Sequence, residues 1–201
     1  MTCVVAQPRF LLAQHWRMVE ALERTIGEIE GRIGTVLAPF REAVGRLTQI
    51  PGIDQTSAQV LVAEIGVNRG QFPTVGHLRS WAGLCPRLDE SAGKQRSTRV
   101  RKGAPWLKPV LVQCAWAAAR SKNTYFQAQF LRLKGRRGAK KAAVAVAASI
   151  LTAAYYILRN GASFRELDPG HFVRHDKAKV AARLARRLRH LGYEVEIRVA
   201  A

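Results

Sequence analysis

Two serine hydroxyls and five cations share a short polar segment near the middle of the 201-residue chain. The hydroxyls belong to Ser91 and Ser97, and the cations to Lys94, Arg96, Arg99, Arg101 and Lys102. A serine hydroxyl is a weak nucleophile until a base takes its proton and a cation stabilises the charge on the phosphorus that it attacks. Arginine and lysine can supply that stabilisation. The segment suits phosphate chemistry, although either serine could also be an ordinary turn residue.

The charge distribution favours a polyanionic partner. The chain carries 33 basic and 14 acidic residues, a formal charge of +19. Residues 1–90 are balanced, whereas residues 91–165 hold sixteen basic residues and no acidic one. A merely solvated surface would interleave both signs. We therefore expect nucleic acid as the partner, contacted by the loop cations and by Arg136, Arg137, Lys140 and Lys141.

Other candidate groups are weaker. His171 and His175 have a helical metal-ligand spacing, but Pro169-Gly170 precedes them and further ligands are not evident, so we expect surface histidines and no metal site. Trp81, Trp106 and Trp116 could stack on bases, but their apolar neighbours favour core packing. The three cysteines are far apart and form no C-x-x-C pair, which favours a reducing cytoplasm over a disulfide framework.

The N-terminal segment predicts a coiled-coil helix. Apolar residues recur at alternating spacings of three and four, a heptad seam that predicts self-association as a homo-oligomer. The alternative is that the stripe packs on its own domain. The seam consists of Val19, Leu22, Ile26, Ile29, Ile33, Val36 and Phe40.

A Pro-Gly turn between two helical patterns predicts a helix-hairpin-helix. Pro51-Gly52 forms the turn, Asp54 can cap the second helix, and that helix should end at Gly66. Such turns aim backbone N–H groups at a DNA phosphate, so Gly52 is a candidate phosphate contact. Asp54 puts a negative charge where phosphate should approach, and a purely structural hairpin remains open.

The rest of the chain is predicted to be mostly helical. Residues 83–103 are rich in turn formers and cations, which favours a loop or ribbon. Helices are expected at 77–81, 104–120, 142–160 and 176–191, with a basic connector over 132–141. The uncharged run 142–158 is slightly short for a membrane span and reads better as a core helix, so no membrane is expected. Alternation after Tyr193 predicts a short C-terminal strand over 193–199.

Residues 50–120 resemble the C-terminal transposase domain of the insertion-sequence-110 family, which comprises bridge-RNA-guided serine recombinases. Similarity continues more loosely to the last helix. The matching segments are Pro51-Gly52-Ile53, Glu64-Ile65-Gly66, Trp81-Ala82-Gly83-Leu84-Cys85-Pro86, Glu90-Ser91-Ala92-Gly93-Lys94, Arg101-Lys102-Gly103, Trp106-Leu107 and Gln113-x-Ala115-Trp116.

The resemblance implies that Ser91 is the nucleophile of DNA strand cleavage and exchange. From the residues alone, Ser97 is its rival, because it lies in the same basic loop. Family members carry an N-terminal RuvC-like domain that holds divalent metal. This chain begins just before the coiled-coil segment, so we expect a truncated copy or fragment, incomplete as an enzyme. Mg²⁺ is expected only with that other domain, and no cofactor in this chain.

The fold expectation is mainly α, with a coiled-coil helix at 1–46, a transposase domain with hairpin and serine loop at 47–165, and a basic helix and strand at 166–201. DNA is the expected partner, together with a guide (bridge) RNA. Two other functions remain open: a non-catalytic helix-hairpin-helix module that binds DNA or RNA, and a decayed product without function.

Overall fold

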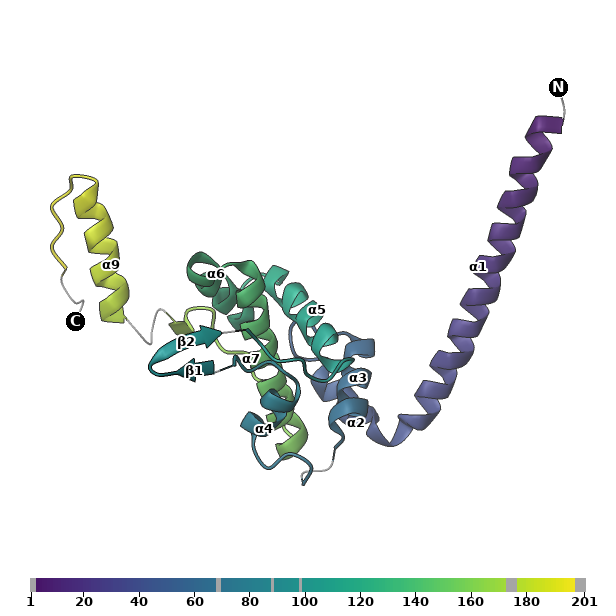
Figure 1. The fold of residues 1–201 in the computed structure, drawn as a ribbon, viewed down its shortest axis with the longest axis horizontal. Coiled ribbons are helices and arrows are strands. Elements are labelled where there is room, and N and C mark those ends of the chain that lie inside the picture. The colour runs from purple at the N-terminus through teal and green to yellow at the C-terminus, as the bar shows by residue number, and fades with distance from the viewer. Residues whose placement is uncertain (1–2, 68–69, 88, 98, 173–176, 198–201) are drawn as a thin grey trace. The chain divides into compact units, whose positions relative to one another are not determined.

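The computed structural model describes residues 3–67, 70–87, 89–97, 99–172 and 177–197. It is mainly helical, as the sequence predicts (Figure 1). The chain divides into two compact units, Met1–Glu42 and Ala43–Ala201.

The first unit is one long helix and a short turn. The helix α1 (Cys3–Val36) runs through Gly27, Gly31 and Gly34 without a break. It ends before Pro39, which lies in the 3-10 turn η1 (Ala38–Phe40) because proline cannot donate the next helical hydrogen bond. The apolar seam residues are exposed along α1, including Val19 at 45%, Ile26 at 53% and Ile33 at 38%.

The second unit is built around one alanine-rich helix. α7 (Ala139–Asn160) buries ten residues, among them Val146, Ile150 and Leu151. It packs against α4 (Val75–Trp81), α5 (Leu107–Arg120) and α6 (Tyr125–Arg137). Alanines on the buried faces of α5 and α7 let the two backbones approach closely. The uncharged run is thus a core helix, which ends at Gly161 in the left-handed conformation.

Two helices flank the Pro-Gly turn. α2 (Arg41–Leu47) precedes it and α3 (Gln55–Ile65) follows. Asp54 caps α3, since its Oδ1 accepts a hydrogen bond of 2.8 Å from the Ser57 N–H. This contact with Ser57 lowers the pKa of Asp54. The predicted cap and the predicted end at Gly66 are both confirmed.

The basic connector predicted over 132–141 is wrong. Residues up to Arg137 belong to α6, and Gly138 alone separates this helix from α7. Thr124 begins α6, because its hydroxyl accepts a hydrogen bond from the Gln127 N–H. The run of cations obscured the pattern, since only Phe126 and Phe130 of α6 are fully buried.

The C-terminal segment contains α9 (Lys177–His190), which carries many arginines. After it, residues 193–197 form no strand. Alternation alone cannot make a strand, because its backbone needs a neighbouring strand to bond with. The predicted Val199 lies outside the described residues.

Candidate active site and nucleic-acid interface

Ser91 lies at the tip of a two-stranded hairpin. β1 (Asp89–Ser91) pairs antiparallel with β2 (Lys94–Ser97), and Ser91 lies directly opposite Lys94. The two residues between them, Ala92 and Gly93, have φ values of 52° and 72°. Positive φ at both central residues is the geometry of the tight turn that matches strand twist. The ribbon expectation for this segment is therefore confirmed.

The base of the hairpin is anchored by close backbone contacts. Pro86 and Val100 form a bridge, and the Arg87 N–H donates to the Arg99 carbonyl at 2.9 Å. Gly83 and Gly103 touch, so a Cβ on Gly103 would lie 2.3 Å from the carbonyl of Ala82. No side chain fits there. These glycines fix where the hairpin leaves the helices.

The two serines of the hairpin differ in exposure and bonding. Ser91 is exposed, and none of the hydrogen bonds among the described residues uses its hydroxyl. Ser97 is half-buried, and its Oγ accepts a hydrogen bond of 3.2 Å from the Arg99 N–H. Directly opposed residues of an antiparallel pair project on the same face, which puts the Lys94 ammonium on the Ser91 side. This geometry favours Ser91 over Ser97 as an accessible nucleophile.

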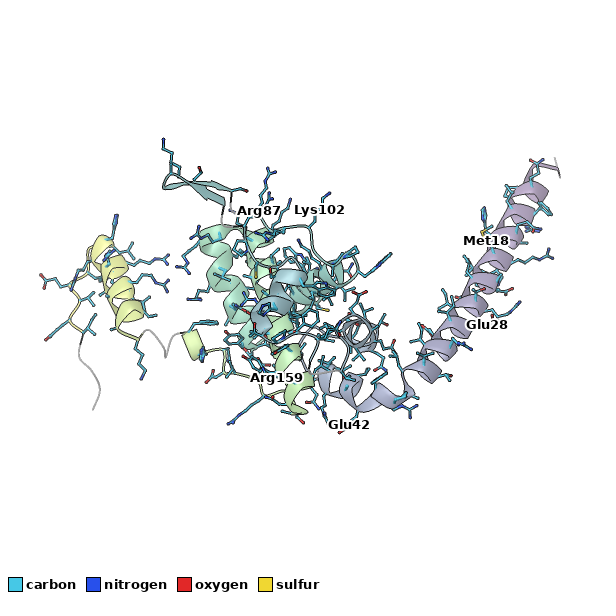
Figure 2. The ribbon with its side chains drawn as sticks, turned by 60° about the horizontal axis from the view of Figure 1, so that its bottom comes forward. Met18, Glu28, Glu42, Arg87, Lys102 and Arg159 are labelled. Carbon is cyan, nitrogen blue, oxygen red and sulfur yellow. The ribbon has the colours of Figure 1, made fainter. Side chains whose placement is uncertain are left out.

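Exposed cations surround the hairpin base. Arg99, Arg101 and Lys102 are exposed, as is Arg87; Figure 2 labels Arg87 and Lys102. The Arg101 carbonyl accepts a hydrogen bond of 2.7 Å from Lys108 Nζ, which ties the segment after β2 to α5. Lys94 is exposed at the tip, whereas the side chains of Asp89, Glu90, Gln95 and Arg96 lie outside what is described.

The second group of predicted cations lies where two helices meet. Arg136 and Arg137 are in the last turn of α6, and Lys140 and Lys141 in the first turn of α7; all four are exposed. Cations suit the C-terminal end of a helix, but they are electrostatically unfavourable at an N-terminal end, which attracts anions. α7 begins at Gly138 with no side-chain cap. A bound phosphate would both neutralise the cations at the start of α7 and accept hydrogen bonds from its uncapped N–H groups.

Gly52 has a packing role. Its φ is +90°, and an added Cβ would lie 2.4 Å from the Cys114 carbonyl oxygen and 2.6 Å from the Ala118 nitrogen. The Cα of Gly52 therefore faces the backbone of α5. Packing therefore explains why position 52 is a glycine, and it favours a purely structural role for the helix-hairpin-helix. Phosphate binding by Gly52 stays a prediction.

Trp106 is wrongly predicted as a core residue. It is 73% exposed at the start of α5, where the inward positions are taken by Leu107 and Leu111. Its neighbours in sequence include Lys102 and Lys108. Trp81 is 41% exposed and packs on Phe72, whereas Trp116 is half-buried against Phe130. Trp106 is thus an available stacking surface, which its place just after the basic segment could have suggested.

The described residues offer no grouping of three histidine, cysteine or carboxylate side chains that fits a metal ion. His171 packs edge-on against Tyr125 and Phe172. The second histidine of that spacing, His175, lies outside the described residues.

Comparisons with known proteins place this domain. Residues 44–131 match the model of the family described as "Transposase IS116/IS110/IS902 family". The chain is also 28% identical over 132 residues to a Sinorhizobium fredii (strain NBRC 101917 / NGR234) protein described as "Putative transposase y4pF/y4sB", an alignment covering 63% of this chain and 34% of the relative. The chain thus spans about a third of that relative's length. The matched segment contains the Pro-Gly turn, the hairpin with Ser91, α5 and the start of α6. Residues 44–131 are therefore similar to the transposase domain of the IS116/IS110/IS902 family.

Proposed function

We propose that this chain binds DNA and exchanges its strands through a covalent bond to Ser91. The single observation that carries the proposal is the position of Ser91. It is exposed at the tip of a tight hairpin and opposite Lys94, in a domain of a transposase family. A nucleophile needs access to the phosphodiester and a nearby cation, and this position supplies both.

The reaction is a pair of transesterifications. Ser91 Oγ bonds to phosphorus while the bond from phosphorus to a sugar oxygen breaks. The serine proton passes to a base, and the departing sugar oxygen gains a proton. A sugar hydroxyl of a second strand then attacks the phosphoserine and releases Ser91. Because each step exchanges one phosphate ester for another, no ATP is needed.

Lys94 is the proposed electrostatic partner of this reaction. Its ammonium would stabilise the extra negative charge on the phosphoryl oxygens as the fifth bond to phosphorus forms. The proton acceptor is Asp89, Glu90 or a group of a RuvC-like domain. Any Mg²⁺ is assigned to that domain, as the family resemblance implies.

DNA binding rests on two groups of cations, which are exposed wherever their side chains are described. The hairpin group is Lys94, Arg96, Arg99, Arg101 and Lys102, and the helix-junction group is Arg136, Arg137, Lys140 and Lys141. The side chain of Arg96 is not described. Phosphate contacts of this kind position a duplex without reading its sequence. A guide RNA could bind the same cations. The protein is proposed to be cytoplasmic.

Self-association is the proposed role of α1. Its seam exposes a continuous row of apolar side chains at heptad spacing. A second copy of the helix would cover this row. Two copies would bring two serines to one DNA site, as strand exchange requires.

A non-catalytic nucleic-acid-binding module is the second candidate. Exposed Trp106 favours it, since a tryptophan among cations can stack on a base without any cleavage. In that case the basic surface would be retained and Ser91 would be dispensable.

Trapping on a suicide DNA substrate separates the two candidates. The chain is incubated with a nicked duplex whose cleavage releases a short fragment, alone and with a RuvC-like domain and Mg²⁺ added in trans. We expect a protein–DNA adduct that Ser91→Ala abolishes and Ser97→Ala retains. Lys94→Ala should lower the adduct yield at least about tenfold, with DNA affinity changed far less. Equal trapping of the Ser91→Ala protein would exclude Ser91 as the nucleophile.

A further inference from the structure

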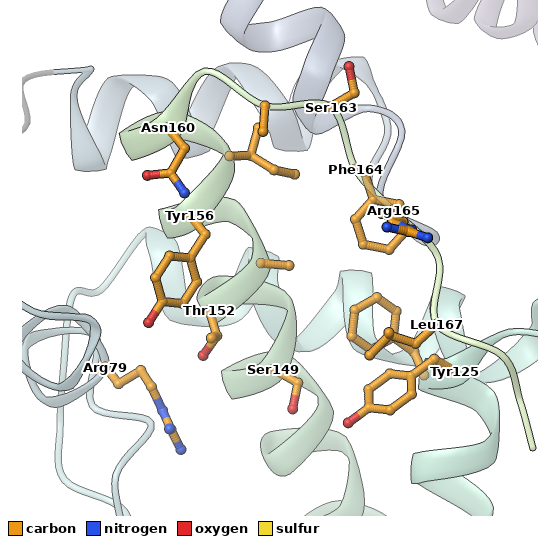
Figure 3. A pocket seen from close by; sticks show the side chains of 14 residues that line it. Arg79, Tyr125, Ser149, Thr152, Tyr156, Asn160, Ser163, Phe164, Arg165 and Leu167 are labelled. Carbon is orange, nitrogen blue, oxygen red and sulfur yellow. The ribbon is translucent and has the colours of Figure 1, made fainter. Parts of the chain in front are cut away.

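A pocket of about 480 Å³ opens between α4, α6, α7 and the segment after α7. Its volume lies in the range of small-molecule sites. The walls are mainly apolar, with the rings of Tyr125, Phe126, Tyr156 and Phe164 among them. Figure 3 shows Arg79 reaching toward the face of α7 that carries Ser149 and Thr152. The pocket lies apart in sequence from the hairpin of Ser91.

Arg79, which lines this pocket, has one hydrogen-bond donor without a partner among the described residues. That donor is its Nε, which is buried. A buried donor without an acceptor destabilises a protein, so native structures seldom leave one. The other charged residue of the pocket lining is Arg165. The pocket therefore calls for a ligand that presents hydrogen-bond acceptors to Arg79.

The opposite wall presents acceptors. The Thr152 hydroxyl donates to the Ala148 carbonyl at 2.8 Å. The Ser149 hydroxyl donates to the Ala145 carbonyl and accepts from Gln129 Nε2 at 2.8 Å. A hydroxyl has one proton and two acceptor lone pairs. With both protons bonded to the helix backbone, the remaining lone pairs can only accept, so a ligand would meet them with N–H or O–H groups.

We propose that this pocket holds an unpaired guanine of the bound nucleic acid, an inference that rests on the nucleic-acid binding proposed above. Guanine carries the acceptors O6 and N7 on one edge, the preferred bidentate partners of arginine. Its Watson–Crick edge carries N–H donors, which suit Ser149 and Thr152. Its flat faces suit the aromatic walls. Adenine would point its amino group at Arg79, donor against donor.

The base must be unpaired because pairing occupies the edge that faces Thr152. Bulged, looped or displaced nucleotides meet this condition at lower cost than a base flipped from an intact duplex. The guanine could come from DNA or from RNA, since the pocket contacts involve the base.

Fluorescence anisotropy with bulged hairpins tests this proposal. The Ser91→Ala protein is titrated with DNA and RNA hairpins that carry a single bulged nucleotide. The bulge is G, A, C, T (in DNA) or U (in RNA), or an abasic site. We expect the G bulge to bind roughly fivefold or more tightly than the A or abasic bulge. The DNA and RNA series show which strand supplies the base. Equal affinity for all bulges in both series would overturn the proposal.

Two variants and a control locate the preference. Thr152→Val is nearly isosteric and removes an acceptor, and Arg79→Lys removes the bidentate fork; each should erase the G preference. Lys141→Ala should weaken every hairpin by the same factor and keep the preference. Thermal unfolding identifies any variant that fails to fold. A G preference retained in folded Thr152→Val would contradict the assignment.

Two further results separate this proposal from its alternatives. Guanosine monophosphate, which carries the same base, should abolish the G preference among the nucleic-acid hairpins, and adenosine monophosphate should not; a G preference that persists in excess guanosine monophosphate would overturn the assignment to this base. Because cleavage is never measured, the G preference stands or falls independently of Ser91 chemistry. An absence of binding to all hairpins would instead refute the nucleic-acid-binding function.

Discussion

At the scale of single residues, Gly52 is the clearest case of a residue set by packing. Gly52→Ala should reduce the free energy of unfolding by about 2–5 kcal/mol, because it combines a left-handed conformation with overpacking against α5. Gly161→Ala is the control, since its φ is +63° but an added Cβ would meet only the end of the Arg46 side chain. It should cost about 1 kcal/mol. Urea unfolding measures both, and equal losses would show that α5 yields to the new methyl group.

Asp54 links the stability of α3 to pH. Asp54→Ala should cost about 1 kcal/mol at neutral pH through loss of the cap, and Asp54→Asn should cost little. The contact with Ser57 depresses the pKa of Asp54 in the folded state. Its charge-dependent contribution is therefore present above the unfolded pKa, near 4, and is lost as the pH falls through the folded value.

Urea titrations between pH 7 and pH 2.5 check this linkage. The stability of the wild-type chain relative to Asp54→Asn should decline below about pH 4. A difference that grows toward acid would show that Asp54 is better bonded when protonated.

Sequence reasoning was most successful where a residue acts on its own backbone. The Asp54 cap, the ends of α3 and α7 at glycines, and the ribbon around Gly93 all follow from local chemistry. It failed where residues distant in sequence decide whether a side chain is buried. Trp106 has apolar neighbours in sequence but a solvent-facing position, and α6 hides its helical pattern among cations.

The pocket and the packing of Gly52 could not be predicted at all. Arg79 and Thr152 are distant in sequence and line one pocket only because α4 packs on α7. Likewise, nothing in the sequence near Gly52 indicates that α5 will press against it. The candidacy of Ser91 came from family resemblance, and the hairpin adds its exposure and its pairing with Lys94.

At the scale of elements, the seam of α1 predicts a concentration-dependent assembly. Ile26→Lys should raise the dissociation constant of self-association roughly tenfold or more, because it buries an unpaired charge between helices. Thr25→Lys adds the same charge off the seam and is the control. Light scattering coupled to size exclusion measures both. The stability of the unit from Ala43 onward should not change, and a wild-type chain that stays monomeric at high concentration would exclude the coiled coil.

The start of α5 predicts a stacking contribution to binding. Trp106→Ala should weaken binding to single-stranded DNA by about 1–3 kcal/mol, since a base loses its aromatic partner. Trp116→Phe is the contrasting variant, because that half-buried ring packs on Phe130 and should affect stability more than affinity. Anisotropy titrations at two salt concentrations separate stacking from electrostatic attraction. The loss of binding free energy in Trp106→Ala should be the same at both concentrations. A loss that shrinks with salt would indicate a charge effect instead.

At the scale of the whole molecule, the uneven distribution of charge predicts the salt dependence of binding. Each lysine or arginine that neutralises a phosphate of B-DNA adds about 0.9 to the slope of log affinity against log salt. If Lys140 and Lys141 each contact a phosphate, the double alanine variant should lower that slope by about 1.8. The matched control removes the same charge from α1, as Arg17→Ala with Arg24→Ala, where basic and acidic residues are interleaved. Its slope should stay that of the wild type. Equal decreases in both variants would mean that DNA responds to the net charge of +19 rather than to a surface within residues 91–165. The proposal that this region positions the phosphodiester at Ser91 would then lose its electrostatic basis.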